Sequence, residues 1–126
     1  MKILVVDDEP HIRHMLRFLF EKRGHDVITV EDGRLACDAV ASDPPDIVFL
    51  DLNLPSMSGF EVCEEIREQV GHRSLPIYIL TAQGQDIDRE RGLALGATDY
   101  ITKPFSPSHL AEIVEALDDR SSTPQR

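Results

Sequence analysis

The chain has 126 residues and a formal net charge of −10, with 13 basic and 23 acidic side chains. This length suits one domain with a single core, and 41% hydrophobic with 29% charged residues indicates a folded chain rather than a disordered one. The apolar runs are about four residues long, against about 20 for a membrane-spanning helix, and no signal-peptide pattern follows Met1. We therefore expect a cytoplasmic protein without a membrane segment, whose negative charge disfavours direct binding of nucleic acid.

Five short apolar runs predict strands at residues 3–6, 27–30, 47–50 and 77–80, with a weaker one at 100–102. Runs without polar alternation are typical of strands that are covered on both faces. The segments between them have apolar residues three and four positions apart, which predicts helices. This alternation with short connections predicts a parallel sheet with right-handed crossovers, inside a three-layer α/β/α sandwich.

Capping and breaking residues set the expected limits of the helices. The expected helices are residues 12–20, 33–42, 60–70, 86–95 and 107–117. Asp32 is placed to cap the second helix, and Gly71 and Gly96 to end the third and fourth. Pro107 lies in the first turn of the fifth helix, where proline is tolerated.

Cysteines and histidines offer little metal-binding pattern. Cys37 and Cys63 lie in predicted helices without C-x-x-C spacing, so we expect buried, reduced thiols. His11 and His14 share one face of the first helix and could form a metal pair. Surface histidines are the better interpretation, because the sequence places no third ligand beside them.

Polar side chains follow the predicted strands directly. They are Asp7, Asp8 and Glu9 after the first strand, Asp51 after the third, Thr81 after the fourth, and Lys103 with Pro104 after the fifth. Parallel strands end at one edge of the sheet, where ligands collect. If the first and third strands are neighbours, about 4.8 Å apart, Asp8 and Asp51 approach one another and need a cation or a proton between them.

The chemistry of this edge suits magnesium and a phosphoryl group. Mg²⁺ prefers hard oxygen ligands and is usually held by one or two carboxylates plus a phosphate. A threonine hydroxyl and a lysine ammonium opposite such a metal match the charge on the oxygens of a transferring phosphoryl group. The nucleophile would be a carboxylate, and the product an acyl phosphate.

Four segments of the chain carry a resemblance to a known family. They are residues 3–9 (ILVVDDE), 45–59 (PDIVFLDLNLPSMSG), 79–82 (ILTA) and 96–105 (GATDYITKPF). In this order they resemble a response-regulator receiver domain of two-component signalling, over about residues 2–119. The resemblance implies a flavodoxin-like fold with five helices and a five-stranded parallel sheet of order 2-1-3-4-5. We therefore expect a receiver domain at residues 1–120, and the polar composition of residues 121–126 predicts a tail or the start of a linker.

The resemblance implies phosphoryl transfer from the phosphohistidine of a histidine kinase, or from a phosphotransfer protein, to Asp51. Asp8 and Asp51 would bind Mg²⁺ directly, together with the backbone carbonyl of Asn53, and Asp7 largely through water. Pro55 and Gly59 would shape the loop after the phosphoacceptor.

Further residues take roles from the same resemblance. Thr81 and Lys103 would hold phosphoryl oxygens, and the Lys103–Pro104 peptide would be cis, which the proline makes feasible. Asn53 and Gln83 would border the path of the hydrolytic water and tune the lifetime of the phosphoryl group.

The implied output is a switch. The Thr81 hydroxyl would move toward the phosphoryl group and the Tyr100 ring would turn inward, changing the surface of the fourth helix, fifth strand and fifth helix. That surface would control an output domain or a downstream protein. Arg91 and Asp99 fit the charged positions of a subfamily that dimerises there, whereas Glu112 replaces the usual basic residue, so a phosphorylation-dependent homodimer stays open.

Two alternative functions fit parts of the pattern. An Mg²⁺-dependent aspartyl-phosphate hydrolase often has an aspartate two residues after the nucleophile, where this chain has Asn53. A pseudo-receiver that binds partners constitutively would not need the complete set of polar groups at the strand ends. The sequence therefore favours a phospho-accepting receiver, either standing alone or cut from a longer chain.

Overall fold

The computed structural model describes residues 1–69, 71, 74–82 and 86–122, and within these ranges strands and helices alternate throughout. The strands are β1 (Lys2–Val6), β2 (Asp26–Val30), β3 (Ile47–Asp51), β4 (Ile77–Thr81) and β5 (Asp99–Thr102). The helices are α1 (Pro10–Glu21), α2 (Gly33–Ser42), α3 (Gly59–Glu68), α4 (Asp86–Ala94) and α5 (Pro107–Ser122).

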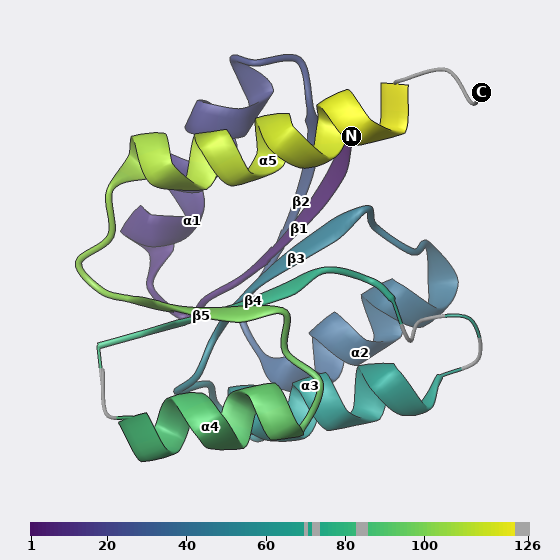
Figure 1. Cartoon of the computed structure of the whole chain (residues 1–126), viewed down its shortest axis with the longest axis vertical. Coiled ribbons are helices and arrows are strands. Elements are labelled where there is room, and N and C mark those ends of the chain that lie inside the picture. Colours follow the sequence, from purple (N-terminus) through teal and green to yellow (C-terminus); the bar gives the residue numbers. More distant parts are fainter. Residues whose placement is uncertain (70, 72–73, 83–85, 123–126) are drawn as a thin grey trace.

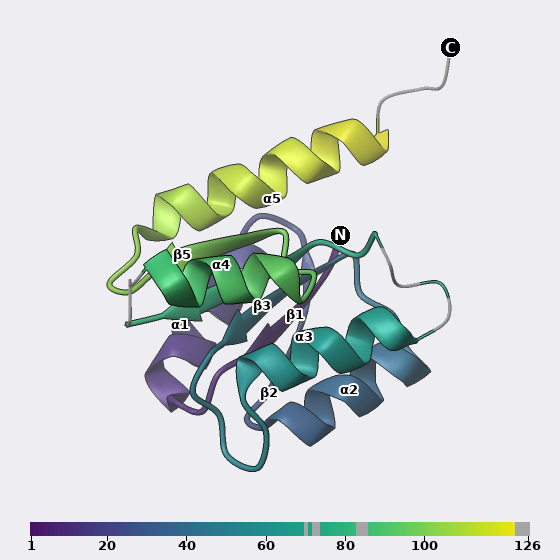
Figure 2. The same cartoon turned by 60° about the horizontal axis from the view of Figure 1, so that its bottom comes forward.

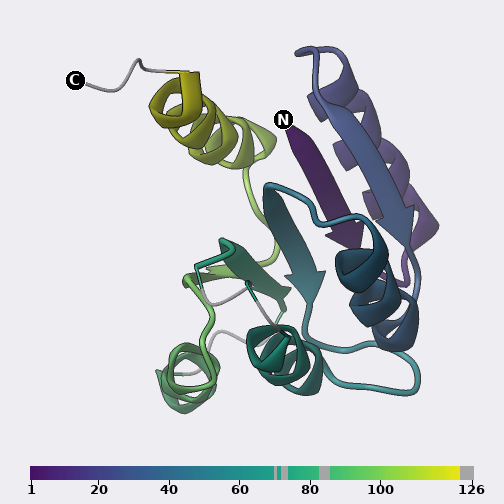
Figure 3. The ribbon, with the colours of Figure 1, turned by 90° about the vertical axis from the view of Figure 1, so that its right-hand side faces the viewer.

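The five strands form one parallel sheet in the order β2-β1-β3-β4-β5. Helices cover both faces, with α1 and α5 on one side and α2, α3 and α4 on the other (Figures 1 and 3). The predicted three-layer fold and its strand order are confirmed.

Two hydrophobic clusters lie on the two faces of the sheet. Leu4 and Val6 face the cluster with α2 and α3, whereas Ile3 and Val5 face the cluster with α1 and α5. Because both faces are buried, the strands can be apolar throughout, as their sequences predicted. Phe20 of α1 stacks on Phe49 of β3 with ring centroids 5.5 Å apart, which fixes α1 against the middle of the sheet.

Local hydrogen bonds explain where the helices begin and end. The Asp32 carboxylate accepts a bond of 2.8 Å from the Leu35 N–H, which confirms the predicted N-cap of α2. α3 begins at Gly59 and ends at Glu68, so the expected helix of residues 60–70 was wrong at its C-terminus. It ends early because Gln69 adopts an extended backbone and its side-chain amide donates to the Cys37 carbonyl at 3.2 Å.

Glycine ends α4 as expected. Gly96 has a φ of +106°, and its carbonyl accepts bonds of 2.9 and 2.7 Å from the Arg67 guanidinium of α3. The C-terminal end of α4 is therefore fastened to α3, beside which it lies in Figure 2.

The two cysteines belong to the core. Cys37 and Cys63 are buried and free, and burial raises the pKa of their thiols to about 12 and about 11. Among the described helices, none combines the length and the apolarity that crossing a bilayer requires.

Candidate functional site

The polar residues at the strand ends meet at one edge of the sheet. β1 and β3 are adjacent, with Val6 paired with Leu50, so Asp7 and Asp51 leave neighbouring strands at the same level. Thr81 pairs with Thr102 where β4 and β5 end, directly before Lys103. The topology thus brings together side chains that are nearly 100 residues apart in the sequence.

Three carboxylates form a cluster at this edge. One oxygen each from Asp7, Asp8 and Asp51 lies within 4.8 Å of the others. Asp7 is fully buried and Asp51 is 5% exposed, whereas Asp8 is exposed to solvent. The cluster therefore combines two desolvated acids with one that remains accessible.

Lys103 places its ammonium inside this acidic cluster. Its Nζ donates to Asp7 Oδ2 at 2.9 Å and lies 3.6 Å from Asp51 Oδ1 and 3.7 Å from Glu9 Oε1. The Lys103 N–H donates to the Thr81 carbonyl at 2.6 Å, and the Lys103–Pro104 peptide is cis. One ammonium thus faces several carboxylates and does not neutralise them all.

The pKa values of Asp51 and Lys103 are both raised, for different reasons. Burial, with the negative charge of Asp7, raises the pKa of Asp51 from its ordinary 3.8 to about 6, against the opposing effects of Lys103 and the Asn53 N–H. Burial alone would lower the pKa of Lys103. Its hydrogen bond to Asp7 and the charges of Asp7, Asp51 and Glu9 outweigh burial and raise it.

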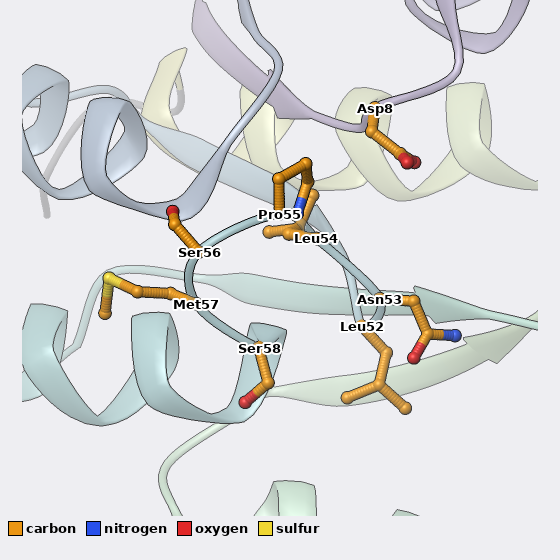
Figure 4. Close-up of a pocket in the computed structure, with 8 residues that line it drawn as sticks. All are labelled: Asp8, Leu52, Asn53, Leu54, Pro55, Ser56, Met57 and Ser58. Atoms are coloured by element: carbon orange, nitrogen blue, oxygen red, sulfur yellow. The ribbon is translucent and has the colours of Figure 1, made fainter.

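The donor set fits a small, hard divalent cation. Carboxylate oxygens are the ligands that Mg²⁺ prefers, and a cation would offset the burial and the repulsion from Asp7 that raise the pKa of Asp51. A cavity of about 580 Å³ opens beside the cluster, between Asp8 and the loop that follows β3. In Figure 4, Asp8 and Asn53 lie on separate segments across this opening, so the accessible side of the cluster has room for hydrated ligands.

The loop after β3 is packed closely against the backbone of Asp51. A Cβ on Gly59 would lie 2.6 Å from the Asp51 carbonyl oxygen, and the Gly59 N–H donates to the Leu52 carbonyl at 2.8 Å. Ser56 has a φ of 65°, in the left-handed region. Ser58 and Glu61 form a reciprocal capping box at the start of α3. These contacts fix the path of the chain from Asp51 to α3.

The remaining candidates lie around the cluster or away from it. Thr81 is fully buried, and Tyr100 is buried beside Ile79 in the adjacent strand. Asn53 is exposed. Gln83 lies outside the described residues. His11 and His14 are exposed on α1, and they do not belong to the carboxylate cluster at the strand ends.

Two contacts of the site were missed from the sequence. Arg13 of α1 donates from Nη1 to the Asp7 carbonyl at 2.7 Å, and the Ser58–Glu61 capping box starts α3. The S-x-x-E pattern before an apolar run could have indicated the capping box. Arg13 had a weaker signal, a cation on a half-buried position of an amphipathic helix.

Comparison with known proteins decides the family. The model of the response regulator receiver domain matches residues 3–115. The chain belongs to this family. The expected resemblance is therefore confirmed, and aspartate phosphorylation and magnesium binding are typical of this family.

Known relatives agree with the assignment. The alkaline phosphatase synthesis transcriptional regulatory protein PhoP of Bacillus subtilis (strain 168) is 45% identical over 120 residues, covering 95% of this chain and 49% of that protein. The receiver domain thus spans about half the length of this curated relative. The chemotaxis response regulator CheY4 of Vibrio cholerae has a TM-score of 0.86 at 34% identity, over 92% of this chain and 97% of that one. The BeF3-activated N-terminal receiver domain of Klebsiella pneumoniae RstA has a TM-score of 0.82 at 31% identity, over 92% and 97%.

Proposed function

We propose that this receiver domain accepts a phosphoryl group on Asp51, in an Mg²⁺-dependent reaction, and relays the signal of a histidine kinase. The observation that carries the proposal is the buried Asp51 carboxylate, clustered with Asp7 and Asp8 and 3.6 Å from the Lys103 ammonium. A nucleophile, a cation-binding set and a fixed positive charge at one sheet edge are the parts that phosphoryl transfer needs.

The transfer step makes one bond and breaks one bond. An oxygen of the Asp51 carboxylate forms the new bond to phosphorus while the P–N bond of the donor phosphohistidine breaks, and the imidazole leaves. Asp8, Asp51 and the Asn53 carbonyl would hold Mg²⁺, with Asp7 acting largely through water. When bound, Mg²⁺ would neutralise charge on the phosphoryl oxygens.

Thr81 and Lys103 would bind the transferred group. Lys103 is already within 3.6 Å of the Asp51 carboxylate, and Thr81 ends the neighbouring strand β4. The ammonium would exchange part of its contact with Asp7 for a phosphoryl oxygen. Asn53 and Gln83 would tune the lifetime of the product.

The phosphoryl group would act on the α4–β5–α5 surface through Thr81 and Tyr100. Tyr100 lies in β5, one strand from Thr81, and its ring is 3.7 Å from the position a Cβ would take on Gly92 of α4. A shift of this ring would therefore change its packing against α4. The proposed partners are a cytoplasmic kinase or phosphotransfer protein, and an output domain or downstream protein.

A homodimer across the same surface remains a prediction, and two of the charged residues that would form it already make contacts within the chain. Asp99 pairs with Arg89 of the same chain at 3.3 Å, and Arg91 stacks on the Phe60 ring at 4.5 Å. Both groups would have to exchange these contacts for new ones, and Glu112 adds a negative charge to α5. Sedimentation with and without beryllofluoride tests the dimer, and a monomer in both states would exclude it.

Labelling by acetyl phosphate tests the function. With Mg²⁺ we expect one added phosphoryl group by intact mass, lost in Asp51→Asn and kept in the matched control Asp38→Asn on the exposed side of α2. EDTA should abolish the labelling. Persistent labelling of Asp51→Asn would refute the proposed acceptor. Many turnovers on a phosphomonoester would favour a phosphatase instead.

A further inference from the structure

Arg13 ties α1 to the backbone of the acidic cluster. Its Nη1 donates to the Asp7 carbonyl oxygen at 2.7 Å, and its side chain is only 16% exposed. Its Nη2 lies 3.8 Å from Glu31 Oε2, beyond the end of β2. A guanidinium that is this buried and this close to one carbonyl has a defined position, although it does not touch the carboxylates themselves.

The two carboxylates that follow β1 are supported differently. Asp7 is held by its side chain, because Oδ1 accepts from the Glu9 N–H at 2.9 Å and Oδ2 from Lys103 at 2.9 Å. Asp8 has no such support: within the described part of the chain, its side chain makes no hydrogen bond or ion pair. The place of the Asp8 carboxylate therefore depends on its backbone.

We infer that Arg13 is a positioning residue of the cation site, which holds the Asp7–Asp8 peptide and through it the Asp8 carboxylate. The Asp7 carbonyl belongs to the peptide that joins the two aspartates, so its hydrogen bond resists rotation of that peptide. Rotation would move the Asp8 carboxylate away from those of Asp7 and Asp51. At present one oxygen of each of the three carboxylates lies within 4.8 Å of the others. This inference rests on the proposed function, because Asp8 needs a fixed place only if the cluster binds a cation.

Charge and geometry predict opposite effects of removing Arg13. A guanidinium near three carboxylates repels an approaching cation, so its loss would tighten Mg²⁺ binding if charge alone mattered. Loss of the hydrogen bond would leave Asp8 free to move and would weaken binding. Mutation of a residue that orients a metal ligand commonly lowers the metal affinity about 10-fold or more. The sign of the change therefore separates the two roles.

Titration calorimetry with Mg²⁺ alone tests the inference on the unphosphorylated chain. We expect Arg13→Gln to weaken binding about 10-fold and Arg13→Lys to weaken it less, since a lysine ammonium keeps the charge and can restore one bond. The matched control is Arg17→Gln, which removes the same charge one turn later. Arg17 contacts the Val27 carbonyl and Thr29 of β2, not the cluster, so binding should be unchanged or slightly tighter.

Each result has a defined meaning. If wild type fails to bind Mg²⁺, the proposed function itself fails. If wild type binds and Arg13→Gln binds equally or more tightly, the positioning role is wrong while the proposed function stands. Thermal unfolding in EDTA checks that the variants fold. Should Arg13→Gln not fold, Arg13→Met is measured instead, because it keeps the apolar part of the side chain but has no donor for the Asp7 carbonyl. Weaker binding supports positioning, and equal or tighter binding overturns it.

Discussion

Burial and the neighbouring negative charge of Asp7 both raise the pKa of Asp51. The carboxylate is 5% exposed, close to Asp7 and Asp8, and Lys103 is the ammonium that offsets them. Lys103 Nζ lies nearer to Asp7, at 2.9 Å, than to Asp51, at 3.6 Å, so Asp51 is the less compensated of the two buried acids. A bound cation would therefore stabilise the charged form of Asp51 more than that of Asp7.

Removing the ammonium should therefore cost stability in a cation-dependent way. We expect Lys103→Met to lower the free energy of unfolding by about 2–4 kcal/mol in EDTA, because it leaves buried Asp7 without its positively charged partner. Saturating Mg²⁺ should recover much of this loss by replacing the missing charge. Urea unfolding measures both values, with exposed Lys22→Met as the control. An equal loss with and without Mg²⁺ would contradict the shared role of the two cations.

Gly59 tests how closely the loop after Asp51 is packed. Helix propensity alone would make Gly59→Ala stabilising by about 0.5–1 kcal/mol. A Cβ would instead lie 2.6 Å from the Asp51 carbonyl and 2.9 Å from the Leu52 Cα, both backbone atoms. We expect a loss of about 2–4 kcal/mol by urea unfolding. In Gly92→Ala the closest atom is a side-chain methyl at 3.2 Å, so the change should stay within about 1 kcal/mol.

At the scale of helices and strands, the sequence predicted those features that depend on residues close together in the chain. Apolar runs predicted each of the described strands, and Asp32 was predicted as the cap of α2, where its carboxylate accepts from the Leu35 N–H. The early end of α3 was not predictable, because it depends on Gln69 reaching Cys37, 32 residues away. The same holds for Arg67, which binds the Gly96 carbonyl from another helix. Such contacts require the fold before they can be recognised.

The capping box of α3 should contribute measurably to its stability. In Ser58→Ala the Glu61 N–H loses its acceptor, so we expect a loss of about 1 kcal/mol in the free energy of unfolding. Ser42→Ala is the matched control, since Ser42 is the last residue of α2 and its exposed hydroxyl donates to the Asp38 carbonyl one turn earlier. A cost no greater than that of the control would show that the Ser58 cap contributes nothing.

At the scale of the molecule, the site could be located from the sequence because parallel topology gathers strand ends. Lys103 and Asp7 are 96 residues apart, yet each follows a buried strand, so their meeting was foreseeable. Which carboxylate Lys103 would prefer, and that Arg13 would hold the Asp7 carbonyl, were not. Those choices depend on side-chain distances set by the packing of α1 and β5, and periodicity carries no such information.

Proton linkage ties the stability of the whole chain to Asp51. The folded-state pKa of Asp51 is raised to about 6 from 3.8, so the folded state binds this proton more tightly. Its contribution to stability is complete below about pH 4 and is lost as the pH rises through 6. His25 acts in the opposite sense, because burial and the N-terminal amine lower its pKa, and protonation of the unfolded state then costs stability as the pH falls below 6.5.

Comparing wild type with Asp51→Asn separates the two groups, because His25 is common to both proteins. In EDTA we expect Asp51→Asn to be more stable than wild type by about 1–3 kcal/mol at pH 7.5, and this excess to shrink toward pH 4. Mg²⁺ at pH 7.5 should stabilise wild type more than the variant and narrow the gap, since a bound cation favours the folded state. Urea unfolding at several pH values gives the differences directly. A gap that is independent of pH would mean that the charge of Asp51 is not the source of the strain at the site.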